Sequence, residues 1–197
     1  MQAYQKRAPY VIDWLAELAR QQQRRIIIRL VKGAYWDHEI QSSQALGLEN
    51  CPVFTSKAAT DVSFMACAQK MLNLTDIVYP QFGTHNAHSI ATILEMAPGE
   101  CAMEFHFLCG MGTVLCEQLI AIGKRCRMHA PFGYHQDACA YFVRRLAEYG
   151  ANTSFVNQCA DPRVPMTQLL TDPVAQVVRN LQSENPALGS IPTSGRE

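Results

Sequence analysis

The chain repeats one pattern four times: a short apolar run, a cluster of glycine and polar residues, and then a helical pattern. The predicted strands cover residues 26–31, 77–82, 102–108 and 127–130. Strands that alternate with helices are parallel, because each helical crossover returns the chain to the same end of the sheet. The fold class is therefore α/β. An open doubly wound sheet and a (β/α) barrel both satisfy the pattern, although four strands do not close an eight-stranded barrel.

The helices that join these strands are expected from the spacing of apolar residues. One begins near Pro9, and another begins near residue 60 with Thr60 and Asp61 as its cap. Others are expected over residues 89–96, 115–122 and 138–149. Residues 34–59 form a long polar connection, and a connection of that length inside a compact domain is usually functional.

Composition excludes several classes of protein. Lys and Arg together number 17, as do Asp and Glu, so the formal net charge is zero. A neutral chain has no long-range field to hold nucleic acid or an anionic membrane, so any site for a charged ligand must be local. The eight cysteines form no CxxC pair, which indicates free thiols in the reducing cytoplasm. The sequence shows no signal peptide and no apolar run of membrane-spanning length.

The last predicted helix has two distinct faces. Its apolar face carries residues at helical spacing, namely Cys139, Phe142, Val143 and Leu146. A second set with the same spacing lies nearly opposite, namely Tyr141, Arg144, Arg145 and Glu148. Spacing alone favours a solvated outer face for this second set. The alternative is a clamp, in which the two guanidinium groups hold a substrate carboxylate and Glu148 orients one of them.

Arg29 lies in a predicted strand that is otherwise apolar and that we expect to be a buried parallel strand. Because a buried, unpaired charge is costly, this side chain must meet an anion, a polar cofactor or the open end of the strand. Gly33 follows the same strand and would let a ligand approach the backbone closely, although a simple turn needs a glycine equally.

Histidines and a glutamate suggest a metal site as an alternative. His85 and His88 lie three residues apart, and Glu104 and His106 alternate along the next strand, as in some metal-dependent barrel hydrolases. The HExxH motif is absent, as are GxGxxG after a strand and the GxSxG nucleophile elbow. The spacing of residues alone therefore predicts an α/β domain that binds a ligand or acts as an enzyme, and nothing more specific.

Longer strings are more specific than these spacings. They include RLVKGAYWD at 29–37, TDVS at 60–63, YPQFGTHNAH at 79–88, EF at 104–105 with GMG at 110–112, and YFVRRLAEYGANTSFVN at 141–157. In this order they resemble the proline dehydrogenase domain of proline utilization A. The resemblance runs from Gln2 to about Ala175.

The resemblance implies a distorted (β/α)8 barrel of the TIM type, of which this chain is the part from the fourth to the eighth helix. It implies noncovalently bound FAD, oxidation of L-proline to Δ1-pyrroline-5-carboxylate by hydride transfer from C5 to flavin N5, and electron transfer to a membrane quinone. We expect residues 1–175 to be barrel and residues 176–197 to be a linker or disordered tail. In this family we expect a cytoplasmic enzyme, peripheral to the inner membrane in its full-length form.

The resemblance also assigns roles to single residues. Arg29 is similar to the arginine beside flavin N5, where a positive charge stabilises the reduced flavin. The other expected FAD contacts are Gln2, Val31, Lys32, Gly33, Ala34, Trp36, Thr55, Ser56, Lys57, Thr60, His85 and Asn86. The expected carboxylate clamp is Arg144 and Arg145, supported by Glu148. The expected apolar wall of the proline pocket is Tyr35, Leu108 and Tyr141. No metal is implied.

Some positions depart from the family pattern. His129 stands where the family usually has a pocket tyrosine, and Cys109 replaces a histidine before Gly-Met-Gly. The first three strands of the barrel and the aldehyde dehydrogenase domain of the bifunctional family lie outside this sequence. A second hypothesis is therefore a catalytically inert fragment that needs the N-terminal half of the barrel, with the metal-dependent hydrolase as the third.

Overall fold

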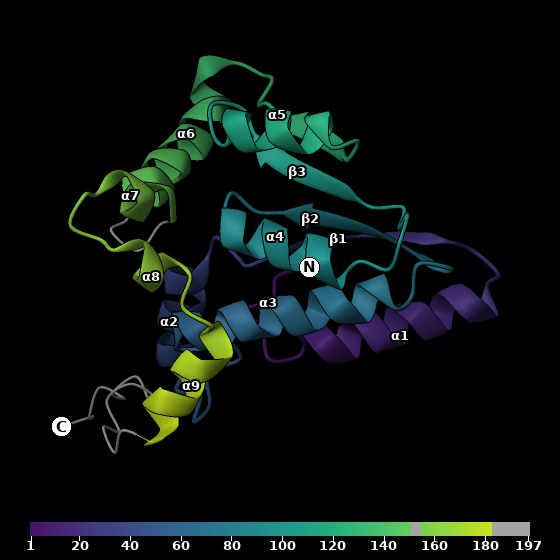
Figure 1. Ribbon diagram of the computed structural model, residues 1–197. Helices are drawn as coiled ribbons and strands as arrows, with labels where there is room; N and C mark the ends of the chain where they lie inside the picture. The colour runs from purple at the N-terminus through teal and green to yellow at the C-terminus, as the bar shows by residue number, and fades with distance from the viewer. Residues whose placement is uncertain (151–154, 183–197) are drawn as a thin grey trace.

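The computed structural model describes residues 1–150 and 155–182. Its centre is a sheet of four parallel strands in the order β1-β2-β3-β4, drawn in the middle of Figure 1. The strands are β1 (Ile26–Val31), β2 (Val78–Gly83), β3 (Glu104–Leu108) and β4 (Arg125–His129). The predicted α/β class with parallel strands is confirmed, and each predicted strand is present with ends shifted by a few residues at most.

Helices connect the strands and continue after the last one. In chain order they are α1 (Ala8–Gln21), α2 (Trp36–Ala45), α3 (Lys57–Leu72), α4 (Ala87–Met96), α5 (Thr113–Ala121), α6 (His135–Gly150), α7 (Phe155–Ala160), α8 (Met166–Leu169) and α9 (Pro173–Gln182). In Figure 1, α1 and α3 run side by side, and α6 and α7 follow the last strand. No described helix is long and apolar enough to cross a membrane.

The two faces of the sheet differ in polarity because side chains alternate along each strand. One face is apolar and packs against the helices. Its fully buried side chains include Leu30, Val78, Phe82, Phe105 and Phe107. The opposite face carries the alternate residues, many of them polar, including Arg29, Gln81, Glu104, His106 and Arg127. The helices therefore leave one polar face of the sheet available for a site.

The N-terminal segment extends the edge of β1. The backbone N–H of Ala3 donates to the carbonyl of Val31 at 2.8 Å, and the N–H of Val31 donates to the carbonyl of Met1 at 3.0 Å. Ser63 of α3 fixes the same segment, since its hydroxyl donates to the carbonyl of Ala3 at 2.7 Å. These bonds hold the first residues of the chain beside the carboxyl end of β1.

Three expectations are corrected by the fold. The polar connection contains a helix, α2, and α3 begins at Lys57 with Ser56 as its N-cap, so Thr60 and Asp61 lie in its first turn. β1 is buried on one face only, because Ile27 is 67% exposed and Arg29 is exposed as well. Arg29 therefore meets an open face and not the core.

The C-terminal part of the described chain is more regular than the proline content indicated. The helix α9 covers Pro173–Gln182, so the first residues of the expected linker are helical. The division at residue 175 into a barrel and a linker stays a prediction, and residues 183–197 lie outside the described residues.

The apolar face of the sheet should dominate the stability of the fold. Phe105 is fully buried, and replacing it with alanine should lower the free energy of unfolding by about 3–5 kcal/mol through lost burial and a cavity. Phe132 is fully exposed, so its replacement with alanine should change stability by about 0.5 kcal/mol at most. Urea unfolding followed by circular dichroism measures both. Equal losses would contradict the described core.

Candidate functional site

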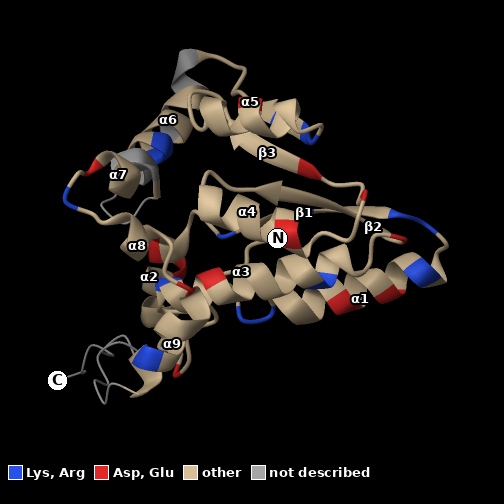
Figure 2. Cartoon of the chain, viewed as in Figure 1, with Lys and Arg blue, Asp and Glu red and all other residues tan. Residues whose placement is uncertain are grey.

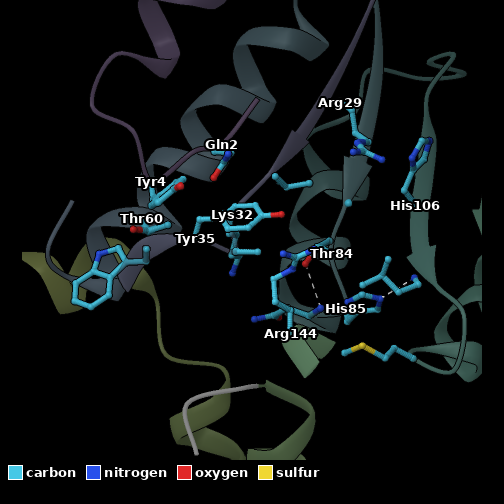
Figure 3. A pocket seen from close by; sticks show the side chains of 18 of the residues that line it. Gln2, Tyr4, Arg29, Lys32, Tyr35, Thr60, Thr84, His85, His106 and Arg144 are labelled. Carbon is cyan, nitrogen blue, oxygen red and sulfur yellow. Dashed lines mark hydrogen bonds between the residues drawn. The ribbon is translucent and has the colours of Figure 1, made fainter. Parts of the chain in front are cut away.

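A pocket with a volume of about 840 Å³ lies at the carboxyl ends of the strands. This volume is in the range of sites for cofactors and small molecules, roughly 300–1,000 Å³. In Figure 3, Arg29 and His106 lie toward one end of the pocket, and Gln2, Tyr4 and Thr60 lie toward the other. The carboxyl ends of parallel strands are where the loops of α/β folds build their sites.

Most of the residues that the resemblance singled out line this pocket. They are Gln2, Arg29, Val31, Lys32, Gly33, Ala34, Tyr35, Trp36, Thr55, Lys57, Thr60, His85, Asn86, Leu108, Tyr141, Arg144 and Arg145. Ser56 is not among the lining residues that the structure describes, and it stands at the N-cap position of α3 without a side-chain capping bond. The side chain of Glu148 lies outside the described part of the chain. The pocket therefore gathers the predicted residues, while their individual roles remain predictions.

The pocket is cationic although the whole chain is neutral. Its Lys and Arg side chains are Arg29, Lys32, Lys57, Arg144 and Arg145, and Asp61 is the one acidic residue among the described lining residues. Asp61 forms ion pairs with Lys32 and with Lys57, the latter at 3.7 Å between Nζ and Oδ2. Burial lowers the pKa of Lys32, and Asp61 opposes that shift. The excess of positive charge suits an anionic ligand.

The helix α6 directs its arginines toward the pocket, and they form its blue turn in Figure 2. The guanidinium of Arg144 lies 5.4 Å from the centroid of the Tyr35 ring, and that of Arg145 lies 5.4 Å from the Tyr141 centroid. The apolar face of α6 is the exposed one, with Leu146 at 73%. The two arginines therefore line the pocket and do not form the outer face of α6, with Arg144 exposed and Arg145 half-buried. Cation–π contacts hold both arginines beside predicted substrate residues.

Local hydrogen bonds fix the loop after β2. The backbone N–H of Leu108 donates to Nε2 of His85 at 3.1 Å, so the other ring nitrogen, Nδ1, carries the proton of the neutral ring. Burial, and then the charge of Arg145, lower the pKa of His85 to about 4. The side-chain oxygen of Asn86 caps α4 by accepting from the N–H of Ser89 at 3.1 Å. His85 is therefore a neutral hydrogen-bond donor in the pocket wall.

The residues present fit a flavin nucleotide. The side-chain oxygen Oε1 of Gln2 is buried and has no hydrogen-bond partner among the described residues, so it is an acceptor for a ligand N–H. Gly33 has φ +132°, and a Cβ there would lie 2.3 Å from the Tyr4 ring, so only glycine fits this part of the wall. Lys32 and Lys57 would neutralise a diphosphate.

A second polar cluster lies on the pocket face of β3. The carboxylate of Glu104 is buried and accepts from Gln81 Nε2 at 2.6 Å and from Arg127 Nε at 3.1 Å, and its Oε1 lies 2.6 Å from His106 Nε2. Among the described residues, no group of three or more His, Cys, Asp or Glu side chains could hold a metal ion. His88 is not one of the described lining residues, so the ligands of the hydrolase hypothesis do not converge there.

Sequence reasoning missed several parts of the wall. Tyr4, Thr84 and Met111 line the pocket, and no spacing rule identified them. Asp61 was assigned to a helix cap, although its distance of four residues from Lys57 is the signal for an ion pair on one face of a helix. His129 was singled out only as a departure from the family pattern.

Comparison with known proteins identifies the family. A family model described as proline dehydrogenase matches residues 1–158. The chain belongs to the proline dehydrogenase family. Members of this family depend on a flavin.

The relatives and solved structures show which part of a larger protein the chain matches. It is 50% identical to bifunctional protein PutA of Klebsiella aerogenes, over 95% of this chain and 15% of that protein. It is 32% identical to the proline dehydrogenase of Deinococcus radiodurans, over 76% of this chain and 44% of the relative. A variant of Bradyrhizobium japonicum proline utilization A superposes with a TM-score of 0.89 at 51% identity, over 95% of this chain and 20% of that one.

These matches confirm the predicted α/β fold as part of a proline dehydrogenase barrel. The chain spans about 15% of the length of the PutA proteins that it matches. Those relatives are named bifunctional, so further domains accompany the matching region in them.

The contact between Gly33 and Tyr4 predicts a site-specific sensitivity. Gly33→Ala combines backbone strain of about 1–3 kcal/mol, because φ +132° lies outside the left-handed region that other residues adopt, with a clash against the Tyr4 ring that adds about 1–3 kcal/mol. Gly99→Ala has only the strain of the left-handed region at φ +50°, about 1–2 kcal/mol, because no atom lies within 4 Å of its added Cβ. Urea unfolding of the two variants should show the larger loss for Gly33→Ala. Equal losses would mean that the Tyr4 ring moves away freely.

The lowered pKa of His85 predicts a pH dependence of stability. The pKa of His85 is 6.5 in the unfolded chain and about 4 in the folded chain. Between these two pH values the unfolded chain binds a proton at His85 that the folded chain does not. The free energy of unfolding should therefore fall as the pH drops through this interval. His85→Gln should remove part of this slope, whereas His38→Gln, at an exposed position of α2, should keep it. Identical slopes in all three proteins would contradict the buried, neutral state of His85.

Proposed function

We propose that this chain carries the carboxylate clamp and much of the flavin site of a proline dehydrogenase. The reaction is the oxidation of L-proline to Δ1-pyrroline-5-carboxylate by hydride transfer from C5 to flavin N5, with the electrons passed to a quinone. The observation that carries this proposal is the pair Arg144 and Arg145, which faces Arg29 across one cationic pocket in a member of a flavin-dependent family.

FAD would supply the two-electron acceptor, and the residues of this chain would hold it. Arg29 lies on the open face of β1, where its charge suits a flavin that becomes anionic on reduction. Gln2 offers an acceptor that lacks a partner among the described residues, and Lys57, which lines the pocket, offers a cation for the phosphates. Val31, Gly33 and the neighbouring backbone would form the surface against which the cofactor lies.

The substrate would be held by charge at one end and by apolar contacts at the other. Two guanidinium groups suit a planar carboxylate, because each can donate paired, charge-assisted hydrogen bonds. The rings of Tyr35 and Tyr141 restrict the arginines through the cation–π contacts, and they form an apolar wall with Leu108. Orientation of the proline ring toward the cofactor is then the main contribution of the protein to a hydride transfer.

The relatives suggest the wider setting of the reaction. The family resemblance implies an aldehyde dehydrogenase domain that would consume the product, and an N-terminal half that would complete the barrel. The relatives are named bifunctional, which agrees with a second activity in them. We propose that the enzyme works in the cytoplasm and meets its quinone at the membrane surface.

The clamp predicts a selective loss of substrate binding. Arg144→Ala or Arg145→Ala should raise the Kd for L-proline by about 10-fold or more, because each removes charge-assisted hydrogen bonds to the carboxylate that contribute about 1.5–3 kcal/mol. The Kd for FAD should change little. Arg179→Ala on α9, outside the pocket, is the matched control and should leave both values unchanged. Parallel losses of FAD and proline binding would mean that the arginines are structural.

The proposed reaction is tested by visible spectroscopy. The chain is purified with FAD, freed of excess cofactor, and mixed with L-proline without oxygen. Retained flavin whose absorbance bleaches on addition of L-proline, but not of D-proline, is the expected result. Flavin that is retained only when the N-terminal half of a relative's barrel is supplied would favour the inert-fragment hypothesis. Bound zinc without flavin would contradict the proposal.

A further inference from the structure

A chain of hydrogen bonds connects the buried carboxylate of Glu104 to the pocket. Oε1 of Glu104 lies 2.6 Å from Nε2 of His106, and Nδ1 of His106 lies 2.8 Å from Nε2 of His129. Glu104 and His106 are both buried on β3, and His129 ends β4 directly opposite Leu108. His106 and His129 both line the pocket. The substrate clamp does not use any of these three side chains.

The positions of the ring protons of His106 and His129 follow from the carboxylate of Glu104, which is the acceptor at the end of this series of hydrogen bonds. Burial opposes the ionised form of Glu104, but bonds from His106 and Arg127 outweigh it, and the pKa of Glu104 lies below its ordinary value. An ionised carboxylate can only accept, so His106 must carry its proton on Nε2. Its Nδ1 then accepts, and the donor is Nε2–H of His129. The ring nitrogen that remains, Nδ1 of His129, keeps a lone pair.

The charges around His129 keep this ring neutral. From β4 it is near Arg127, from β1 near Arg29, and from β3 near His106 and Glu104. Arg144 and Arg145 of α6 line the same pocket. Burial and the neighbouring His106, Arg29 and Arg127 lower the pKa of His129, while Glu104 raises it. A neutral imidazole at pH 7 is a proton acceptor, and the ionised Glu104 behind it stabilises the imidazolium that forms.

We propose that Nδ1 of His129 accepts the proton that the secondary ammonium of bound L-proline must lose before oxidation, and that His106 and Glu104 position this base. The inference rests on the proposed function. The same cations lower the pKa of His129 and disfavour a bound ammonium. The first effect keeps the base unprotonated, and the second favours loss of the ammonium proton.

The step balances in protons and electrons. One N–H bond of the ammonium breaks, its proton joins Nδ1 of His129, and the nitrogen keeps the electron pair. That pair forms the C5=N bond as the C5–H bond breaks and its two electrons leave with the hydride to the flavin. The product is the protonated imine, and the imidazolium of His129 later returns its proton to solvent. His129 is thus a catalytic residue of this scheme, and Glu104 and His106 are positioning residues.

The tautomers can be measured without any reaction. Long-range 1H–15N NMR of the 15N-histidine chain distinguishes the two ring nitrogens, and the variants His106→Gln and His129→Gln assign the signals. We expect Nε2–H tautomers for both histidines at pH 7.5. A proton on Nδ1 of His129 would overturn the proposal, because the acceptor would then be blocked. This result does not depend on bound flavin or on activity.

The role of the base is tested by the pH dependence of flavin reduction at saturating L-proline. In the native chain the rate constant should rise with pH through one ionisation. His129→Gln should lower the rate by about 100-fold and remove this ionisation. Glu104→Gln keeps an acceptor for His106 but loses the charge, so the ionisation should shift to lower pH and the rate should fall. His38→Gln is the control and should match the native chain.

A substrate analogue without an amine separates a base from a structural residue. Cyclopentanecarboxylate retains the carboxylate and the ring, so its Kd in His129→Gln should stay within about twofold of the native value, as expected if the clamp is intact. If L-proline does not reduce the flavin of the native chain, the proposed function is contradicted, and the assignment of His129 with it. If L-proline reduces the flavin of the native chain and that of His129→Gln equally fast, only the assignment of His129 is contradicted.

Discussion

The burial of one face of the parallel sheet determines the rest of the structure. Phe82, Phe105 and Phe107 pack into the helices, and because side chains alternate along a strand, their neighbours must point to the opposite face. Arg29 and Glu104 reach the pocket face by this rule alone. A register shift of one residue would send both charges into the core, where they would be costly, so the same packing that stabilises the fold also places the site.

Glu104 illustrates how the pocket face tolerates a buried charge. Glu104 is 6% exposed, and Gln81, His106 and Arg127 all contact its carboxylate. Such a group is costly when unpaired, and its partners here come from three adjacent strands. The cluster therefore depends on correct pairing of β2, β3 and β4. It also links the fold to the chemistry, because the ionised carboxylate sets the tautomers of His106 and His129.

Much of this arrangement was predictable from the sequence, and the failures have physical reasons. The spacing of apolar residues typical of strands and helices located the sheet. It also showed that clusters of glycine and polar residues follow the strands at their carboxyl ends. Periodicity gave α6 two faces but could not say which one meets the sheet. Hydrophobicity favoured burial of Phe142 and Leu146, whereas the arginines face the pocket and these side chains are exposed. The partnership of Glu104 with Arg127 needs the register between strands, which no local pattern contains.

In the proposed enzyme, one cationic pocket holds both a flavin and the carboxylate of proline. A crystal structure of the chain grown with FAD and the unreactive analogue cyclopentanecarboxylate tests it most directly. The analogue's carboxylate should lie between the guanidinium groups of Arg144 and Arg145, with the flavin ring against Arg29. A carboxylate bound elsewhere, or a flavin ring held away from Arg29, would contradict it.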